Sequence, residues 1–283
     1  MSSDPSGTGT VEDEAQTFCY GHPKTPTRLR CSRCDRPICG RCSIPATVGQ
    51  HCPECVAEAR RTAPKVRSAL RANAPAVYTI IAMNVIVYLA QRLIPGLTDR
   101  LAAHPLAIAE GEYWRLLTSM FLHSPFLIFH ILMNMYVLYV YGPNVEEAFG
   151  TIRFVGMYLI CGFTGSAASY VNGCAGGVGA SGAIFGIAGV LLVYLYKRRT
   201  STLLANAYRS ILIFIGLNLA IGFVFPMIDN WAHIGGLAGG LALGAGLDDP
   251  RHEVSASRQL VVMATVIAVG VAVVALRTMN FSC

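Results

Sequence analysis

The chain has 283 residues, of which 53% are hydrophobic and only 13% are charged, and its formal net charge is +6. A water-soluble domain carries about 25% charged residues, so the composition excludes a chain that folds mainly in water. The small positive charge does not indicate nucleic-acid binding, and its placement along the chain is more informative.

The N-terminal part of the chain is polar and then rich in cysteine. Residues 1–18 are rich in Ser, Gly and Thr, which predicts a disordered tail that lacks the features of a secretory signal peptide. Seven of the ten cysteines follow within 19–56. Four pairs of potential metal ligands, each spaced by two residues, occur there: Cys19 and His22, Cys31 and Cys34, Cys39 and Cys42, and Cys52 and Cys55.

Such pairs allow two ligands to converge on one tetrahedral ion, and eight ligands suit two structural Zn²⁺ ions. The interleaved order suggests that the first pair joins the third and the second joins the fourth. A disulfide framework is the alternative, but the odd number of cysteines and the presence of His22 argue against it. His51 could replace Cys52 as a ligand. The segment resembles a B-box-type or related treble-clef zinc finger, although it departs from the B-box spacing in places.

The other three cysteines, Cys161, Cys174 and Cys283, lie in apolar or terminal sequence. We expect them to be small packing residues or, at the end of the chain, a loose thiol.

A basic linker, 57–75, precedes a series of apolar segments close to the ~20 residues that cross a bilayer as a helix. Seven spans are predicted, of which the second and sixth are the least hydrophobic: 76–95, 125–142, 152–172, 180–196, 207–225, 231–247 and 259–277. The basic linker and the Lys197-Arg198-Arg199 cluster fall on one side, which the positive-inside rule assigns to the cytoplasm. Thiolate-bound zinc suits that reducing side. We therefore expect a multi-pass protein of a bacterial cell membrane, with a cytoplasmic zinc module.

Two polar residues lie at the same depth in different spans. Ser181 is near the outer end of the fourth span and His233 is near the outer end of the sixth. Each span also carries glycines four residues apart, which permit close helix contact: Gly182 and Gly186, and Gly236 and Gly240. This packing could bring the Ser181 hydroxyl to the His233 imidazole, which would act as its base. Ordinary glycine packing around a satisfied core histidine is the alternative.

A second polar pair, His130 and Asn134, lies four residues apart in the second span. Both side chains can donate hydrogen bonds to an oxyanion, as can the backbone N–H of Ser181 at the start of a helix. Interhelical hydrogen bonding without chemistry is the alternative. Phe185, one turn deeper than Ser181, could support the His233 ring or could be plain core.

From about residue 76 to residue 277 the chain resembles the rhomboid family of intramembrane serine proteases. Several motifs carry the resemblance together: Gly179-Ala180-Ser181-Gly182, Ala232-His233 followed by Gly236 and Gly240, His130 with Asn134, Glu112-Tyr113-Trp114-Arg115-Leu116-Leu117-Thr118, and Gly142-Pro143-Asn144-Val145-Glu146 followed by Gly150.

The resemblance implies an all-α polytopic protein with a rhomboid-like six-helix core and one additional C-terminal span. Ser181 would be the nucleophile and His233 the base of a dyad without a third acid. His130 and Asn134 would help form the oxyanion hole, and Gly179 would keep the start of the fourth span open. The family cleaves transmembrane segments of other proteins near the membrane surface and needs no cofactor for catalysis. The zinc module is not part of the common core.

Two other functions are weighed. A non-catalytic rhomboid-like protein could bind membrane proteins while its zinc module recruits a cytosolic partner, but none of the catalytic residues is missing. A transporter would need charged residues along its path, and the spans hold hardly any. A nucleic-acid partner for the module is disfavoured, because arginines on a small finger are often only a solvated face.

Overall fold

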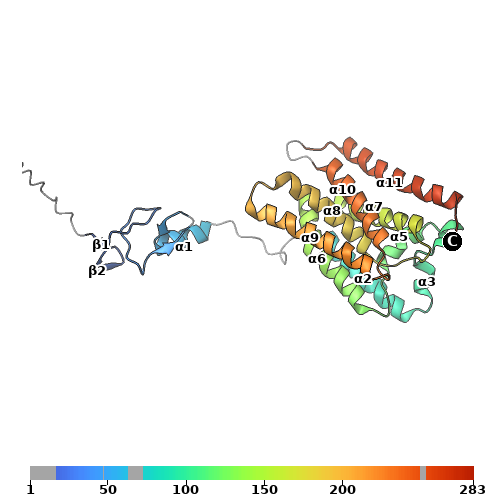
Figure 1. Ribbon diagram of the computed structural model, residues 1–283, viewed down its shortest axis with the longest axis horizontal. Coiled ribbons are helices and arrows are strands. Elements are labelled where there is room, and N and C mark those ends of the chain that lie inside the picture. The colour runs from blue at the N-terminus through green and yellow to red at the C-terminus, as the bar shows by residue number, and fades with distance from the viewer. Residues whose placement is uncertain (1–16, 47, 63–72, 249–252) are drawn as a thin grey trace, which may run out of the picture. The chain divides into compact units, whose positions relative to one another are not determined.

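The computed structural model describes residues 17–46, 48–62, 73–248 and 253–283. The chain divides into two compact units, residues 1–67 and residues 68–283, which are described separately (Figure 1). Most of the expected disordered tail, and residues 63–72 of the expected linker, lie outside the described residues.

The N-terminal unit consists of two small hairpins and a helix. β1 (Phe18–Cys19) pairs antiparallel with β2 (His22–Pro26), and β3 (Ile44–Pro45) pairs antiparallel with β4 (Gln50–His51). Helix α1 (Pro53–Thr62) follows, with a proline in its first turn, where the missing N–H removes no helical hydrogen bond. The buried hydrophobic residues are six of the seven cysteines and Ile38. A core this small needs a metal or disulfides to be stable.

The second unit is a bundle of long helices, each of which overlaps one of the segments predicted as spans. They are α2 (Pro75–Leu93), α6 (Ile128–Phe149), α7 (Thr151–Asn172), α8 (Ser181–Arg198), α9 (Thr202–Val224), α10 (Asn230–Leu247) and α11 (Ala256–Met279). The connection from α2 to α6 contains four short helices: α3 (Leu97–Leu101), α4 (Pro105–Ala109), α5 (Arg115–Thr118) and the 3₁₀ turn η2 (Ser119–Phe121).

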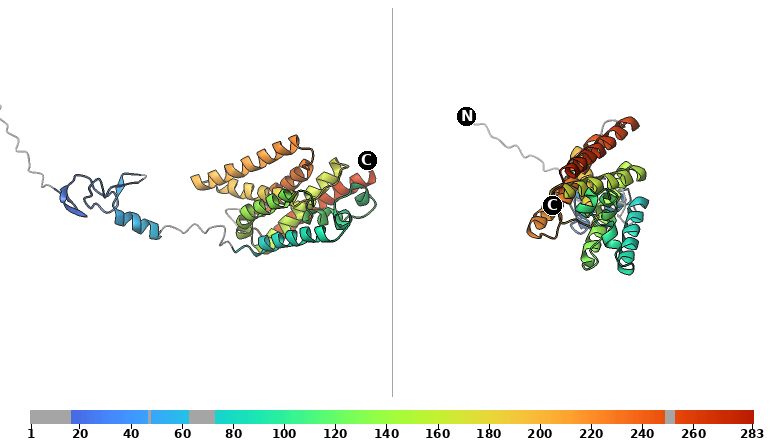
Figure 2. Two further views of the ribbon diagram at one scale, coloured as in Figure 1. Left: turned by 90° about the horizontal axis from the view of Figure 1, so that it is seen from below. Right: turned by 90° about the vertical axis from the view of Figure 1, so that its right-hand side faces the viewer.

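Within the described part of the chain, five of these helices are long and apolar enough to cross a membrane: α2, α7, α8, α9 and α11. Helix α8 is the most buried of the five, whereas α9 and α11 are largely exposed and lie at the periphery of the bundle (Figure 2). Helices α6 and α10, which hold the polar residues of the second and sixth predicted spans, are not among the five. The hydrophobic residues that α9 and α11 expose are suited to contact with lipid.

The central helices α8 and α10 touch backbone to backbone. A methyl group added at Gly236 would collide with the carbonyl oxygen of Gly182, and one added at Gly240 would collide with that of Gly186. Helix α7 joins the same contact, because a methyl group on Gly165 would lie 2.8 Å from the carbonyl oxygen of Ala232. Only glycine allows helices to approach this closely.

A buried glutamate anchors the start of α2. Glu146 of α6 is 2% exposed and accepts hydrogen bonds from the backbone N–H groups of Ala76 at 3.0 Å and Val77 at 2.9 Å. These amides belong to the first turn of α2, where no helical carbonyl can pair with them. A carboxylate is favoured there because the helix dipole places partial positive charge at the N-terminus. The contact explains how an acidic side chain is accommodated inside the bundle.

Two of the scattered cysteines correct the sequence prediction. Cys174, in the loop after α7, forms a disulfide with Cys283 at the end of the chain, 109 residues later. The expectation that both are unpaired was therefore wrong, whereas Cys161 is a free, buried packing residue as predicted. The pairing could not be predicted because it depends on α11 ending beside the loop that follows α7.

The close contact of α8 and α10 can be tested with two matched glycine substitutions. Gly240→Ala forces a methyl group into backbone atoms that cannot move aside, and it should lower the free energy of unfolding by about 1–3 kcal/mol. Gly216→Ala on α9 points into open space and should be neutral or stabilise the helix by up to ~1 kcal/mol. Thermal unfolding in detergent measures both. Equal midpoints for the two variants would contradict the backbone contact.

Candidate functional site

The loop 173–180 delivers Ser181 to the first position of α8. Gly179 in this loop has φ of +139°, a conformation that disfavours any side chain. A Cβ there would also lie 2.9 Å from Nε2 of His130 and 3.8 Å from Oγ of Ser181. Glycine is therefore required at this position on two grounds, and Ser181 and His130 approach the same point from α8 and α6.

The orientation of the His130 ring is set by a backbone contact. The N–H of Ser124 donates to its Nδ1 at 3.3 Å. The proton of the neutral ring must then be on Nε2, the nitrogen that faces Gly179. Asn134, one turn further along α6 and 7% exposed, donates one amide hydrogen to the carbonyl oxygen of His130 at 2.8 Å. Its second amide hydrogen is available to another acceptor.

His233 is held by an aromatic contact deep in the bundle. Its ring stacks on Phe185 with centroids 4.2 Å apart and an angle of 4° between the planes. Phe185 also belongs to the buried core, so the two roles considered for it from the sequence coexist. A stacked ring restricts the rotation of the imidazole, so the ring of His233 is held in one orientation.

Ser181 and His233 lie at one level of the bundle, because the residues next to them in sequence are in contact. A Cβ on Gly182 would be 3.2 Å from the carbonyl oxygen of Ala232. Among the described residues, no hydrogen bond joins Ser181 to His233, and Nδ1 of His233 is buried without a partner. Catalytic hydrogen bonds are often long before substrate binds.

Two residues that the sequence analysis did not select support this region. Asp229 caps α10 by accepting a hydrogen bond from the N–H of Ala232 at 3.0 Å, and its other oxygen accepts from the hydroxyl of Ser169 on α7. An Asp directly before an apolar run is a recognised helix-capping signal, which could have identified the first of these contacts. The partner on α7 has no local signal in the sequence.

His123, in the loop before α6, packs beside the site. It is fully buried, and its ring meets that of His130 edge to face at a centroid distance of 5.1 Å. Gln91 of α2 fixes the backbone there, because its amide oxygen accepts from the N–H of His123 and its amide nitrogen donates to the carbonyl oxygen, both at 3.0 Å. His123 is thus fixed in place and packs against the ring of His130.

Arg115 organises the connection between α2 and α6. It is 8% exposed and forms an ion pair with Glu112. It also donates to the carbonyl oxygens of Asp99 at 2.7 Å and Ala102 at 2.9 Å. The neighbouring Trp114 is half exposed, a position that suits an aromatic residue at the membrane interface.

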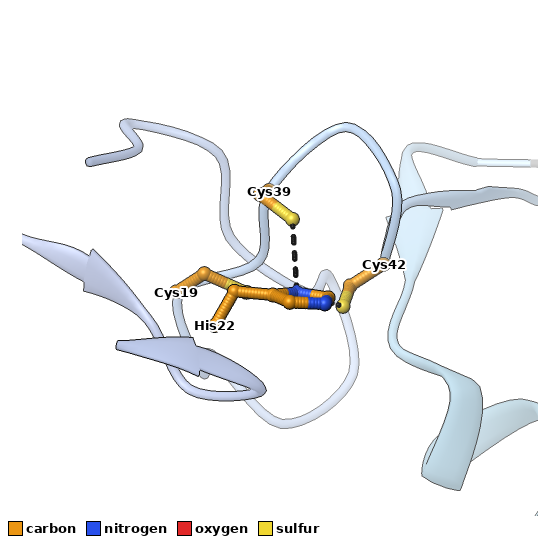
Figure 3. A group of neighbouring side chains, drawn as sticks. All are labelled: Cys19, His22, Cys39 and Cys42. Carbon is orange, nitrogen blue, oxygen red and sulfur yellow. Dashed lines mark hydrogen bonds between the residues drawn. The ribbon is translucent and has the colours of Figure 1, made fainter. Parts of the chain in front are cut away.

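In the N-terminal unit, the ligand pairs come together in the interleaved order that the sequence suggests. Figure 3 shows the first group, in which Nδ1 of His22 lies 3.4 Å from Sγ of Cys39 and 3.3 Å from Sγ of Cys42, with Cys19 at 3.8 Å. All four ligand atoms lie within 4.8 Å of one another. The first and third ligand pairs could therefore hold one metal ion.

The second group consists of Cys31, Cys34, Cys52 and Cys55, whose sulfur atoms also lie within 4.8 Å of one another. It includes Cys52, and His51 belongs to neither group. The backbone N–H of Cys52 donates to Sγ of Cys31 at 3.2 Å. A hydrogen bond from Arg36 to Sγ of Cys34 holds the pKa of that thiol below its ordinary value. Such contacts favour thiolates, the form that binds metals.

The two units thus define a polytopic helical membrane protein with a Ser–His–His–Asn group in its bundle and a cysteine-rich module. A Rhomboid domain model matches residues 110–249. The chain is 31% identical over 175 residues to the rhomboid protein YdcA of Bacillus subtilis (strain 168), an alignment that covers 60% of this chain and 86% of YdcA. The chain belongs to the rhomboid family, and it is an integral membrane protein.

Other relatives are longer than the segment they share with this chain. The Rhomboid protease GluP of Bacillus subtilis (strain 168) is 37% identical over 200 residues, which cover 68% of this chain and 39% of GluP. RHOMBOID-like protein 1 of Arabidopsis thaliana is 40% identical over 143 residues, which cover 49% of this chain and 36% of that protein. The chain therefore spans well under half of these two relatives.

The cap on α10 can be tested by two substitutions at Asp229. Asp229→Ala removes the acceptor for the N–H of Ala232 and for the hydroxyl of Ser169, and it should lower the free energy of unfolding by about 0.5–2 kcal/mol. Asp229→Asn keeps an oxygen that can cap the helix and should lower it less. Thermal unfolding of both variants in one detergent checks the order. If Asp229→Asn and Asp229→Ala lose the same stability, helix capping is not how Asp229 stabilises the protein.

Proposed function

We propose that the protein is an intramembrane serine endopeptidase that cleaves transmembrane segments of other membrane proteins with Ser181 as nucleophile and His233 as general base. The observation that carries this proposal is that Ser181 and His130 both approach Gly179, while the contact of Gly182 with the backbone of Ala232 places Ser181 at the same level as His233. Membership of the rhomboid family, and the protease relatives named above, support the reaction class.

The reaction uses this chain's residues as follows. Ser181 rotates about χ1 to donate to His233, which takes the proton as Oγ attacks the scissile carbonyl carbon. The oxyanion of the tetrahedral intermediate accepts hydrogen bonds from Nε2–H of His130, from the backbone N–H of Ser181 and from the free amide hydrogen of Asn134. His233 then protonates the leaving amine, and water, activated by the same imidazole, hydrolyses the acyl-enzyme.

The substrate must change shape to be cleaved. The carbonyl groups of a transmembrane helix are hydrogen-bonded within the helix, and lipid offers no alternative donors. A substrate segment therefore has to unwind at the site before Ser181 can reach a carbonyl carbon. Segments with helix-breaking residues near the membrane surface should be cleaved best, because they unwind at the lowest free-energy cost.

We propose that the N-terminal unit is cytoplasmic and that the active site opens to the outer face of a bacterial cell membrane. The Cys174–Cys283 disulfide lies toward the Ser181 end of the bundle and suits an oxidising exterior, whereas the seven thiols of the N-terminal unit are free. Lys197 and Arg198 are at the opposite end of α8 from Ser181, as the positive-inside rule requires for a cytoplasmic end.

We further propose that the two Cys/His groups hold two structural Zn²⁺ ions. A tetrahedral zinc ion places its sulfur and nitrogen ligands about 3.6–3.8 Å apart. The ligand atoms are close to this spacing: the Cys34 and Cys52 sulfur atoms lie 3.7 Å apart, and Nδ1 of His22 lies 3.3–3.8 Å from the three sulfur atoms of its group. Zinc bound by four protein ligands has no open position, so the module would present a surface to a cytosolic protein partner rather than catalyse a reaction.

The proteolytic proposal predicts complete loss of cleavage for Ser181→Ala in purified protein with a model transmembrane substrate. A fluorophosphonate, which reacts with activated serines, should label the wild-type protein and not this variant. Ser210→Ala, at an exposed serine on α9, is the matched control and should cleave and be labelled as wild type. His130→Ala should lower kcat by about 10²–10³-fold through loss of an oxyanion donor. Undiminished cleavage by Ser181→Ala would refute the mechanism.

The metal proposal predicts two equivalents of zinc per full-length chain by elemental analysis. The double substitution Cys31→Ser/Cys34→Ser should leave about one equivalent, because the group of Cys19 and His22 is separate. Cys161→Ser, at a free buried cysteine of the membrane unit, should keep both. Finding the same zinc content in all three proteins would exclude this assignment of the ligands.

A further inference from the structure

The loop that precedes Ser181 is fastened to its neighbours by backbone contacts near its end. Gly177 and Ala103 exchange two hydrogen bonds of 3.1 Å, and the N–H of Gly179 donates to the carbonyl oxygen of Ser119 at 3.1 Å. These contacts attach residues 177–179 to the segments between α3 and α6. The first half of the loop, which begins after α7, is attached in another way.

That attachment is the disulfide between Cys174 and Cys283. Cys174 lies seven residues before Ser181. Both cysteines are exposed, so the bond can be reached by reductants in solution. The disulfide joins the active-site loop to the end of α11, the helix added to the six-helix core.

The end of α11 is itself docked against α7. Phe281 stacks on Tyr170 with centroids 6.1 Å apart and an angle of 13° between the rings. The hydroxyl groups of Tyr170 and Thr278 lie 3.0 Å apart, and Arg277 donates to the carbonyl oxygen of Ser282 at 2.8 Å while its guanidinium lies over Phe281. The end of α11 is therefore held in place, so a disulfide to it can restrain a loop.

From these contacts we propose that the Cys174–Cys283 disulfide is a clamp that holds loop 173–180, and with it Ser181, in the geometry for catalysis. The inference rests on the proposed proteolytic function and assigns α11 a part in it. Cys174 and Cys283 are positioning residues, because they act through the loop and do not touch the reacting atoms. Loss of the bond frees one half of the loop while the contacts of Gly177 and Gly179 hold the other half.

The clamp makes the enzyme sensitive to dithiol reductants from the outer face. One thiolate of the reductant attacks a sulfur of the disulfide, the bond between Cys174 and Cys283 breaks, and a mixed disulfide forms. The second thiol of the reductant closes its own ring and releases the protein. The two cysteines gain two electrons and two protons and become thiols, and the dithiol is oxidised to a cyclic disulfide.

The test compares oxidised, dithiothreitol-reduced and re-bridged full-length protein in the same detergent. Cleavage kinetics should show kcat falling about tenfold on reduction, with KM unchanged, because the nucleophile is misplaced while the substrate-binding surface is intact. A bifunctional methanethiosulfonate that reconnects the two thiols should restore kcat. Methyl methanethiosulfonate, which caps both thiols without joining them, should not.

The double variant Cys174→Ser/Cys283→Ser is the matched control for effects of the reductant on the other cysteines. It should begin at the low kcat and should not respond to dithiothreitol, although it keeps every cysteine of the N-terminal unit. If reduction slows this variant as much as the wild type, the effect arises from the metal groups and the clamp is refuted. Unchanged kcat on reduction of the wild type also refutes it.

Hydrogen–deuterium exchange separates the clamp from the protease proposal. Reduction should speed exchange in a peptide covering 173–180 and leave a peptide from the centre of α8 unchanged. If reduction speeds this exchange but the oxidised protein cleaves no substrate, the disulfide does restrain the loop. In that case the catalytic role of the clamp and the proteolytic function are both overturned. Unchanged exchange of 173–180 would overturn the clamp whatever the protein cleaves.

Discussion

The backbone contact between α8 and α10 is the constraint on which the rest of the membrane unit depends. Lipid chains are as apolar as leucine side chains, so helices in a membrane gain little from burying large residues against each other. They associate by close packing, which Gly182, Gly186, Gly236 and Gly240 make possible here. Because the contact joins backbone atoms of both helices, it also sets the level at which Ser181 and His233 enter the bundle.

The polar site is assembled around that contact from four directions. His130 comes from α6, Ser181 from the start of α8, His233 from α10, and the loop through Gly179 comes from α7. Phe185 holds the His233 ring, and the backbone N–H of Ser124 orients the His130 ring. Preorganisation of this kind would serve the proposed active site, because the surrounding solvent is hydrocarbon.

Cysteine has two different roles in the chain. In the N-terminal unit, thiols converge in groups that could hold metal ions, and there they provide the core that so short a segment cannot form from apolar side chains. In the membrane unit, a disulfide joins a loop beside the candidate active site to the chain terminus. Free thiols and a disulfide are stable in different redox compartments, which a membrane separates.

The sequence by itself determined the long helices, the ligand pairs and the candidate polar residues, because hydropathy, two-residue spacing and glycine periodicity are local properties of the chain. It also indicated that the cysteine pairs interleave. Only the tertiary structure revealed the partner of Asp229 on α7 and the disulfide of Cys174, and only it showed the stacking of Phe185 on His233 that the sequence offered as one of two possibilities. These contacts join residues far apart in sequence or depend on side-chain orientation, and both are decided by how the helices pack in three dimensions.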